Sequence, residues 1–121
     1  MKKFFFLAFI MFFVSNCDSQ KEIKTISTKE LKTLIAEEKI QLLDVRTPDE
    51  IEKGHIKSAI FINYFDDNFS EISNKLLDKN KSVYVVCRSG NRSTKACKIL
   101  KEEGFEVVNV LGGYNQWEKE N

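Results

Sequence analysis

The stretch SVYVVCRSGNRS, residues 82–93, joins the strongest predicted strand of the chain to a helix. Residues 82–87 are mainly β-branched, aromatic and apolar, which is typical of a strand buried on both faces. Short polar residues follow, and apolar residues then recur at helical spacing from residue 93 to 103, where Gly104 ends the pattern. A strand, a tight loop and a helix in this order indicate a parallel α/β sheet.

The same alternation extends in both directions along the chain of 121 residues, a length that suits one domain. Short apolar runs predict four more strands, at residues 23–26, 40–45, 59–62 and 107–111. Helical patterns begin near residues 28, 47, 65, 93 and 114, and a capping box of Ser27 and Glu30 opens the first of them. We therefore predict an α/β fold with a mostly parallel central sheet of about five strands and helices on both faces. In such sheets the ligand site lies beyond the carboxyl ends of the strands.

The first 17 residues differ from the rest of the chain. Two lysines precede an unbroken apolar run of 11 residues at positions 4–14, which is too short to cross a bilayer core of about 30 Å. Charge, a short apolar run and then small or polar residues form the layout of a secretory signal. We expect residues 1–16 to be a signal peptide; a short membrane anchor and a buried N-terminal strand are the alternatives.

The end of this run, Val14-Ser15-Asn16-Cys17, resembles the lipobox of bacterial lipoproteins, in which the Cys receives lipid and becomes the mature N-terminus. Asn16 departs from the pattern, where Gly, Ala or Ser is usual, and a plain cleavable signal is the alternative. The resemblance implies lipidation of Cys17, a tether over residues 17–23, and an exported domain, periplasmic or in the cell envelope, that the lipid holds at a membrane.

Composition excludes several other classes of function. The 19 Lys and Arg against 18 Asp and Glu give a formal net charge of +1, so no nucleic-acid partner is expected. The single His argues against a His-rich metal site and against a Cys-His or Ser-His-Asp pair, and we expect no metal and no cofactor. With Cys17 assigned to lipid, Cys87 and Cys97 are too few for a disulfide framework.

The loop that follows Cys87 carries the predicted chemistry. Gly90 and Asn91 readily take left-handed backbone angles, which would turn successive N–H groups inward as an anion-binding nest. The next helix adds the partial positive charge of its N-terminus, and Arg88 and Arg92 add two full charges. All of these favour the thiolate of Cys87, the nucleophilic form, so the site needs no His as a base. The alternative is a structural Cys that ends a core strand before an exposed basic turn.

This loop, residues 87–93, resembles the active-site loop of single-domain rhodaneses, the thiosulfate sulfurtransferases. Two further stretches are similar to other signatures of that family: DVRTPDE with GHIKSAI, within residues 44–60, and LGGYNQW, residues 111–117. Ser58 stands at a turn where many members have Gly. The resemblance covers residues 24–119 and identifies that range as a rhodanese domain with the rhodanese-like fold.

The resemblance implies a mechanism as well as a fold. Cys87 would take a sulfane sulfur from thiosulfate or a similar small sulfur anion and become a persulfide. It would then pass the sulfur to a thiophilic acceptor, which could be cyanide, a thiol or a protein. The residues expected to bind the substrate anion are Arg88, Ser89, Gly90, Asn91, Arg92 and Ser93.

Three other residues have weaker predicted roles. Asp44 and Arg46 end a central strand near the same sheet edge as Cys87, and we expect them to position the loop or to pair with each other. Cys97 lies on the apolar face of the following helix, which favours core packing. A resolving thiol for Cys87 is the alternative role for Cys97.

Two rival functions use the same fold. A Cys-based phosphatase or arsenate reductase needs five residues between the Cys and the Arg that binds the oxyanion, whereas four separate Cys87 from Arg92. A non-catalytic rhodanese-like binding module typically loses the Cys or fills its loop, and here both are intact. The sequence therefore favours a sulfurtransferase.

Overall fold

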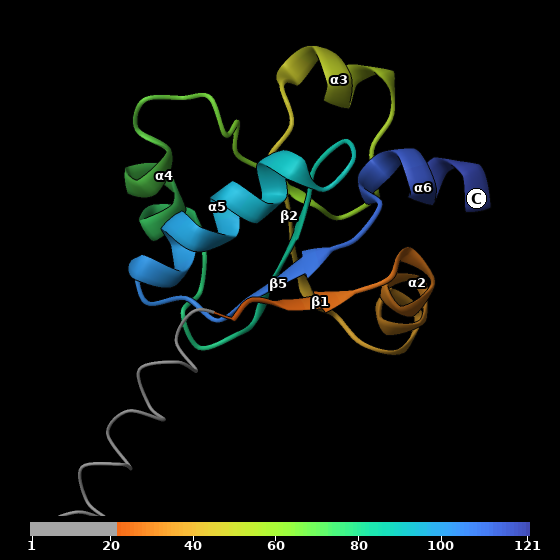
Figure 1. Cartoon of the computed structure of the whole chain (residues 1–121), viewed down its shortest axis with the longest axis horizontal. Coiled ribbons are helices and arrows are strands. Elements are labelled where there is room, and N and C mark those ends of the chain that lie inside the picture. Colours follow the sequence, from red (N-terminus) through yellow and green to blue (C-terminus); the bar gives the residue numbers. More distant parts are fainter. Residues whose placement is uncertain (1–21) are drawn as a thin grey trace, which may run out of the picture.

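The computed structural model describes residues 22–121, which form a five-stranded sheet with helices on both faces (Figure 1). All strand pairs are parallel, in the order β1-β5-β4-β2-β3. The strands are β1 (Lys24–Ile26), β2 (Gln41–Asp44), β3 (Ile60–Phe61), β4 (Val83–Val86) and β5 (Val107–Val110). The helices are α2 (Thr28–Glu37), α3 (Pro48–Lys53), α4 (Phe69–Leu76), α5 (Asn91–Glu102) and α6 (Gly113–Glu120). The predicted fold class is confirmed.

The predicted signal peptide, Cys17 and most of the tether lie outside the described residues. None of the helices in residues 22–121 has the length and hydrophobicity that a transmembrane span requires.

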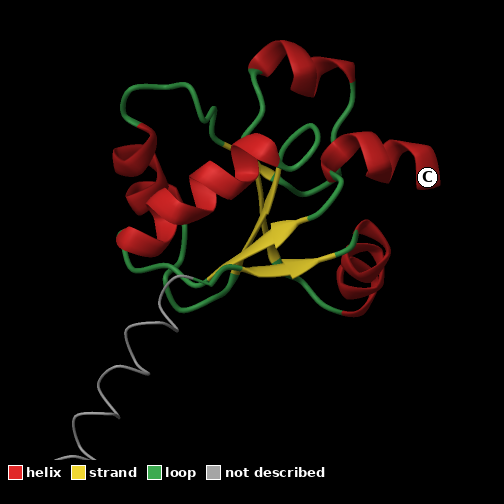
Figure 2. Ribbon diagram, viewed as in Figure 1, coloured by secondary structure: helices red, strands yellow, loops and turns green. Residues whose placement is uncertain are grey.

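Two hydrophobic cores cover the two faces of the sheet. Helices α4 and α5 pack on one face and α2 and α6 on the other, as Figures 1 and 2 show. In the central strand β4, Val83 and Val85 lie in the core under α4 and α5, and Val86 lies in the core under α2 and α6. This alternation follows from the two-residue period of a strand, and hydrophobic residues cover both faces of β4.

The predicted capping box of α2 is present, with the Glu30 N–H donating to Ser27 Oγ at 3.1 Å and the Ser27 N–H to Glu30 Oε1 at 3.0 Å. Helix α3 begins with a second capping box, formed by Thr47 and Glu50. Both devices satisfy N–H groups that the first turn of a helix leaves unpaired. The second box also fixes Glu50 where it meets Arg92 in the first turn of α5.

Two helices begin away from their predicted positions. Helix α4 starts at Phe69 rather than near residue 65, because Asn63 directs a turn: its side chain accepts from the Phe65 N–H and its carbonyl from the Asp66 N–H. Helix α5 starts at Asn91 rather than residue 93. The loop after β4 is therefore shorter than the sequence suggested.

The sheet register brings three loops together at one edge. Asp44 of β2 pairs with Val86 of β4, and Val85 of β4 pairs with Asn109 of β5. The segments after β2, β4 and β5 therefore leave the sheet side by side at their carboxyl ends. Figure 1 shows the loop between β4 and α5 curling at this edge, close to α3 and α6.

Candidate active site

Cys87 directly follows β4 and is almost fully buried, with 1% of its surface exposed. Its Sγ accepts a hydrogen bond from the Gly90 N–H at 3.0 Å. Gly90 has φ 110° and ψ −12°, a left-handed conformation in which a side chain would be strained. The loop curls over its own cysteine sulfur because this residue is a glycine.

The expectation that Asn91 also adopts left-handed angles is wrong. Among residues 22–121, Ser58 is the only non-glycine with positive φ, and Asn91 is the first residue of α5. Because the helix begins two residues earlier than predicted, Gly90 alone makes the turn. The N-terminus of α5, with its partial positive charge, therefore lies close to Cys87.

Ser93 lies in the first turn of α5 and is fully buried. Its Oγ is 3.3 Å from Cys87 Sγ and 3.1 Å from the Gly90 carbonyl oxygen. A hydroxyl carries a single proton. When Cys87 is a thiol, the thiol can donate to Ser93 Oγ while Ser93 donates to Gly90; when Cys87 is a thiolate, the Ser93 proton can turn to the sulfur.

Arg88 of the loop and Arg92 of α5 differ in their surroundings. Arg88 and its neighbour Ser89 are exposed. Arg92 instead forms a two-pronged ion pair with Glu50 of α3, with both N···O distances 2.8 Å. Of the two full charges expected from Arg88 and Arg92, the one on Arg92 is therefore paired with a carboxylate.

The ion pair shifts both partners toward their charged forms. The pKa of Glu50 is lowered to about 2, first because Arg92 donates to its carboxylate. The N–H and the hydroxyl of Thr47 also donate to this carboxylate, while burial acts in the opposite direction. The hydrogen bonds between Arg92 and Glu50 raise the pKa of Arg92. Both groups are charged at neutral pH, so the positive charge of Arg92 is compensated locally.

Asp44 and Arg46 pair with each other, which was one of their two expected roles. Arg46 Nη2 lies 2.9 Å from Asp44 Oδ2, and the same nitrogen donates to the Gly54 carbonyl at 2.8 Å. Both residues are buried. The guanidinium carbon of Arg46 is 4.2 Å from the centre of the Tyr114 ring, a cation–π contact that joins the end of β2 to α6.

Helix α6 holds the backbone of the cysteine loop directly. The Tyr114 N–H donates to the Cys87 carbonyl at 2.7 Å and the Asn115 N–H to the Arg88 carbonyl at 3.0 Å. This contact needs Gly113, because a Cβ there would lie 2.5 Å from the Cys87 carbonyl oxygen. This role was not predicted, although the glycine pair at residues 112–113 is the signal in the sequence that could have suggested a close backbone approach.

Known proteins are similar to this chain over most of its length. The family model described as "Rhodanese-like domain" matches residues 27–120. The chain belongs to the rhodanese-like domain family. The chain is 46% identical to "Putative sulfurtransferase YtwF" of Bacillus subtilis, covering 82% of this chain and 94% of the relative. It is 34% identical to "Thiosulfate sulfurtransferase 18" of Arabidopsis thaliana, covering 86% of this chain and 85% of that protein.

A solved rhodanese-like domain protein from Staphylococcus aureus has the same fold. It is 38% identical, with a TM-score of 0.72, and the match covers 78% of this chain and 91% of that one. Together with the named relatives, this places the chain among rhodanese-like domains with sulfurtransferase homologues.

Cys97 of this rhodanese-like domain lies in the core between α5 and the sheet, with no exposed surface. Burial raises its pKa to about 12, and the nearby Cys87 acts in the same direction. Both cysteines are free thiols. A thiol that remains protonated at neutral pH is a poor resolving group, so the burial of Cys97 favours a role in core packing.

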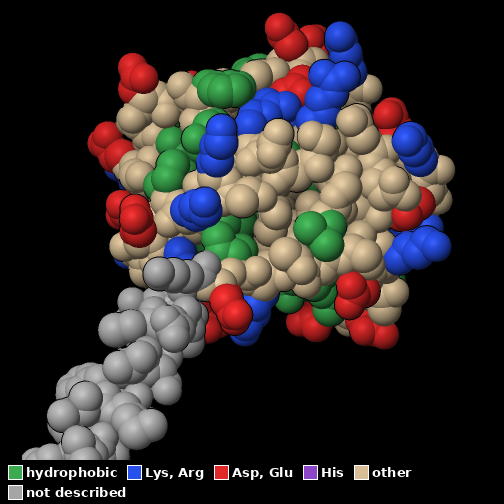
Figure 3. Space-filling view, in the orientation of Figure 1, with side chains coloured by type: hydrophobic (Ala, Val, Ile, Leu, Met, Phe, Trp, Pro, Cys, Tyr) green, Lys and Arg blue, Asp and Glu red, His purple; other side chains and the backbone are tan. Residues whose placement is uncertain are grey.

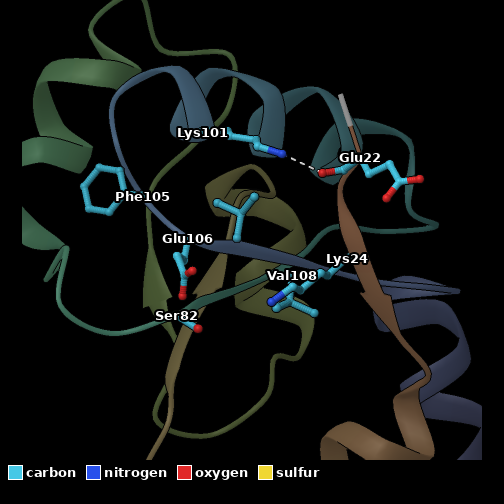
Figure 4. A pocket seen from close by; sticks show the side chains of 8 residues that line it. Glu22, Lys24, Ser82, Lys101, Phe105, Glu106 and Val108 are labelled. Atoms are coloured by element: carbon cyan, nitrogen blue, oxygen red, sulfur yellow. Dashed lines mark hydrogen bonds between the residues drawn. The ribbon is translucent and has the colours of Figure 1, made fainter. Parts of the chain in front are cut away.

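A cavity of about 120 Å³ lies at the far end of the rhodanese-like sheet (Figure 4). It is lined by Lys24 at the start of β1, Val107 at the start of β5 and Ser82 just before β4. The Lys101 ammonium closes one side through a hydrogen bond to the Glu22 carbonyl. Because these are the amino ends of the strands, this cavity is remote from Cys87 and takes no part in its chemistry.

Charged side chains of both signs surround the face seen in Figure 3. Lys and Arg side chains gather at the top of that view, over the region of α3 and the cysteine loop, with acidic side chains beside them. On the face seen in this view, the basic side chains form a small cluster near the site.

Proposed function

We propose that this rhodanese-like domain transfers a sulfane sulfur from thiosulfate, or a similar small sulfur anion, to a thiophilic acceptor through a persulfide on Cys87. The observation that carries the proposal is the Gly90 N–H aimed at Cys87 Sγ, 3.0 Å away, at the N-terminus of α5. A backbone donor and a helix terminus both stabilise negative charge on sulfur.

In the first step, the Cys87 thiolate attacks the outer sulfur of thiosulfate. A new S–S bond forms, and the bond between the two thiosulfate sulfurs breaks with its electron pair leaving on sulfite. The product is a Cys87 persulfide anion. No base is required, since no proton moves when the thiolate is the attacking form.

In the second step, a nucleophile such as cyanide or a thiolate attacks the terminal sulfur of the persulfide. The S–S bond breaks, its electron pair returns to Cys87 as the thiolate, and the acceptor leaves with the sulfur. The Gly90 N–H and the Ser93 hydroxyl are placed to stabilise the thiolate that is regenerated.

Loop size and charge pairing both argue against a phosphatase of the same fold. Phosphate-ester hydrolysis requires an arginine that binds the oxyanion through two of its nitrogens, but Nη1 and Nη2 of Arg92 already bind Glu50.

Two parallel assays test the assignment, one with thiosulfate and cyanide and one with an aryl phosphate. We expect thiocyanate from the first and no phosphate release from the second.

We also propose, from the sequence pattern of residues 1–17, that the protein is exported and that lipid on Cys17 holds the domain at a membrane. Residues 18–23 would then leave only a short connection before β1, which begins at Lys24. The domain would act close to the membrane surface.

A further inference from the structure

The carbonyl of Gly90 is anchored by three donors. It accepts from the Thr94 N–H at 3.2 Å, from Thr94 Oγ1 at 2.7 Å and from Ser93 Oγ at 3.1 Å. On its other side, the same glycine donates its N–H to Cys87 Sγ. Glycine has a wide choice of backbone angles, so the aim of this N–H depends on what holds the carbonyl.

Thr94 links this carbonyl to the sheet. Its hydroxyl has one proton, which goes to Gly90, so the oxygen must act as an acceptor for any further bond. The donor is Asn109 Nδ2 of β5, at 3.0 Å. A helical threonine divides between two side-chain rotamers, and the Asn109 bond favours the rotamer that reaches Gly90.

Asn109 is an unfavourable residue for its position. It is 4% exposed and lies in a strand whose other three residues are buried valines. Its Oδ1 has no hydrogen-bond partner within residues 22–121. A buried amide with an unpaired oxygen destabilises the fold, and asparagine is a poor strand former. Valine would fit the strand better but has no donor, whereas Asn109 provides the bond to Thr94.

We propose that Asn109 is a positioning residue for sulfur transfer: through Thr94 it fixes Gly90 so that the Gly90 N–H points at Cys87 Sγ. Asn109 does not touch the sulfur. The turnover part of this inference rests on the proposed function, whereas its effect on the cysteine itself can be measured separately.

The test compares Asn109→Val, Thr94→Val and the double variant with the wild-type chain. The first readout is the rate at which iodoacetamide alkylates Cys87, followed on the Cys87 peptide by mass spectrometry, on the acid limb of the pH profile. There the rate is proportional to the thiolate fraction. The second readout is kcat and KM for thiosulfate with cyanide as acceptor.

We expect each single variant to lower the alkylation rate and kcat about five-fold, with KM unchanged, because a hydrogen bond to a charged group is weakened. The double variant should be no worse than either single variant, since both act through one chain of bonds. Thr94→Ser, which keeps the hydroxyl, should retain wild-type rates.

Thr33→Val is the matched control. Thr33 Oγ1 makes the same type of bond, to the Lys29 carbonyl at 3.3 Å, on the surface of α2, and its loss should change neither rate. Thermal unfolding identifies the variants that fold. An unchanged alkylation rate in folded Asn109→Val would overturn the inference. If Asn109→Val does not fold, an unchanged rate in Thr94→Val would do the same. Additive effects of the two substitutions in the double variant would also overturn it. If the wild-type chain transfers no sulfur but the variants still alkylate more slowly, the proposed function is refuted and the positioning role of Asn109 is retained.

Discussion

Arg92 in the first turn of α5 and Glu50 of α3 form a two-pronged ion pair across 42 residues of sequence, with both N···O distances 2.8 Å. Each side chain keeps only about a fifth of its surface exposed. The pair joins the N-terminus of α3 to the N-terminus of α5. It also leaves Arg88 as the loop cation without an ion-pair partner within residues 22–121.

The first prediction follows from this asymmetry. Arg88→Gln should raise the KM for thiosulfate about five-fold with little change in kcat, because an exposed charge attracts the donor without contacting the sulfur. The effect should shrink as salt is added. Steady-state kinetics at low and high ionic strength measure it, with the exposed Lys95→Gln on α5 as control. A fall in kcat with KM and salt dependence unchanged would show that Arg88 stabilises the transition state instead.

Acid should weaken the fold through Glu50. Its pKa is lowered from 4.5 to about 2 in the folded protein, so the folded state favours the carboxylate. The resulting stability is fully present above pH 4.5 and is lost as the pH falls toward 2.

We therefore expect the wild-type chain to exceed Glu50→Gln in free energy of unfolding by about 1–2 kcal/mol at neutral pH, allowing for solvent screening. The difference should disappear in acid. Denaturant unfolding across this pH range measures it, and Glu52→Gln, an exposed position on the same helix, should match wild type throughout. A difference that stays constant with pH would mean that the carboxylate charge is not the cause.

Gly113 should tolerate no side chain. Gly113→Ala places a Cβ 2.5 Å from the Cys87 carbonyl oxygen and 2.6 Å from that of Arg88, and both are backbone atoms that cannot move without distorting the loop. We expect a loss of more than about 2 kcal/mol of stability and a large loss of sulfur transfer.

Gly104→Ala is the control for Gly113, since Gly104 also has positive φ but its added Cβ would lie 3.9 Å from the flexible Lys79 side chain. It should lose about 1 kcal/mol from backbone strain and keep its activity. Equal activity losses in the two variants would contradict a specific role for the contact between α6 and the loop.

Cys17 is the subject of the fourth prediction. Cys17→Ser should move the protein from the membrane fraction to the soluble fraction, because the residue that would carry the lipid is removed. Fractionation of cells that express each form measures this. Membrane retention of the variant through an uncleaved N-terminus would refute the lipoprotein interpretation.

The order of strands and helices could be predicted from the sequence because each depends on local patterns. The capping box of Ser27 and Glu30 is such a pattern, and so are the valines of β4. Ser58, at a turn where the family often has Gly, has a left-handed φ of 66°. This is a conformation that glycine adopts more readily.

The contacts that build the site could not be predicted in the same way. Glu50 meets Arg92, and Tyr114 meets the Cys87 carbonyl, only after the sheet has assembled. Asn109 falls within an apolar strand, and nothing local indicates that its amide reaches Thr94. Long-range partners such as these follow from topology and register rather than from spacing along the chain.

Whether Cys87 carries the transferred sulfur can be measured by intact-mass analysis of the chain before and after exposure to thiosulfate. We expect the wild-type chain and Cys97→Ala each to gain one sulfur atom, Cys87→Ser to gain none, and cyanide to remove the added sulfur as thiocyanate. A gain that persists in Cys87→Ser, or one that disappears in folded Cys97→Ala, would show that Cys87 is not the sole carrier of the sulfur.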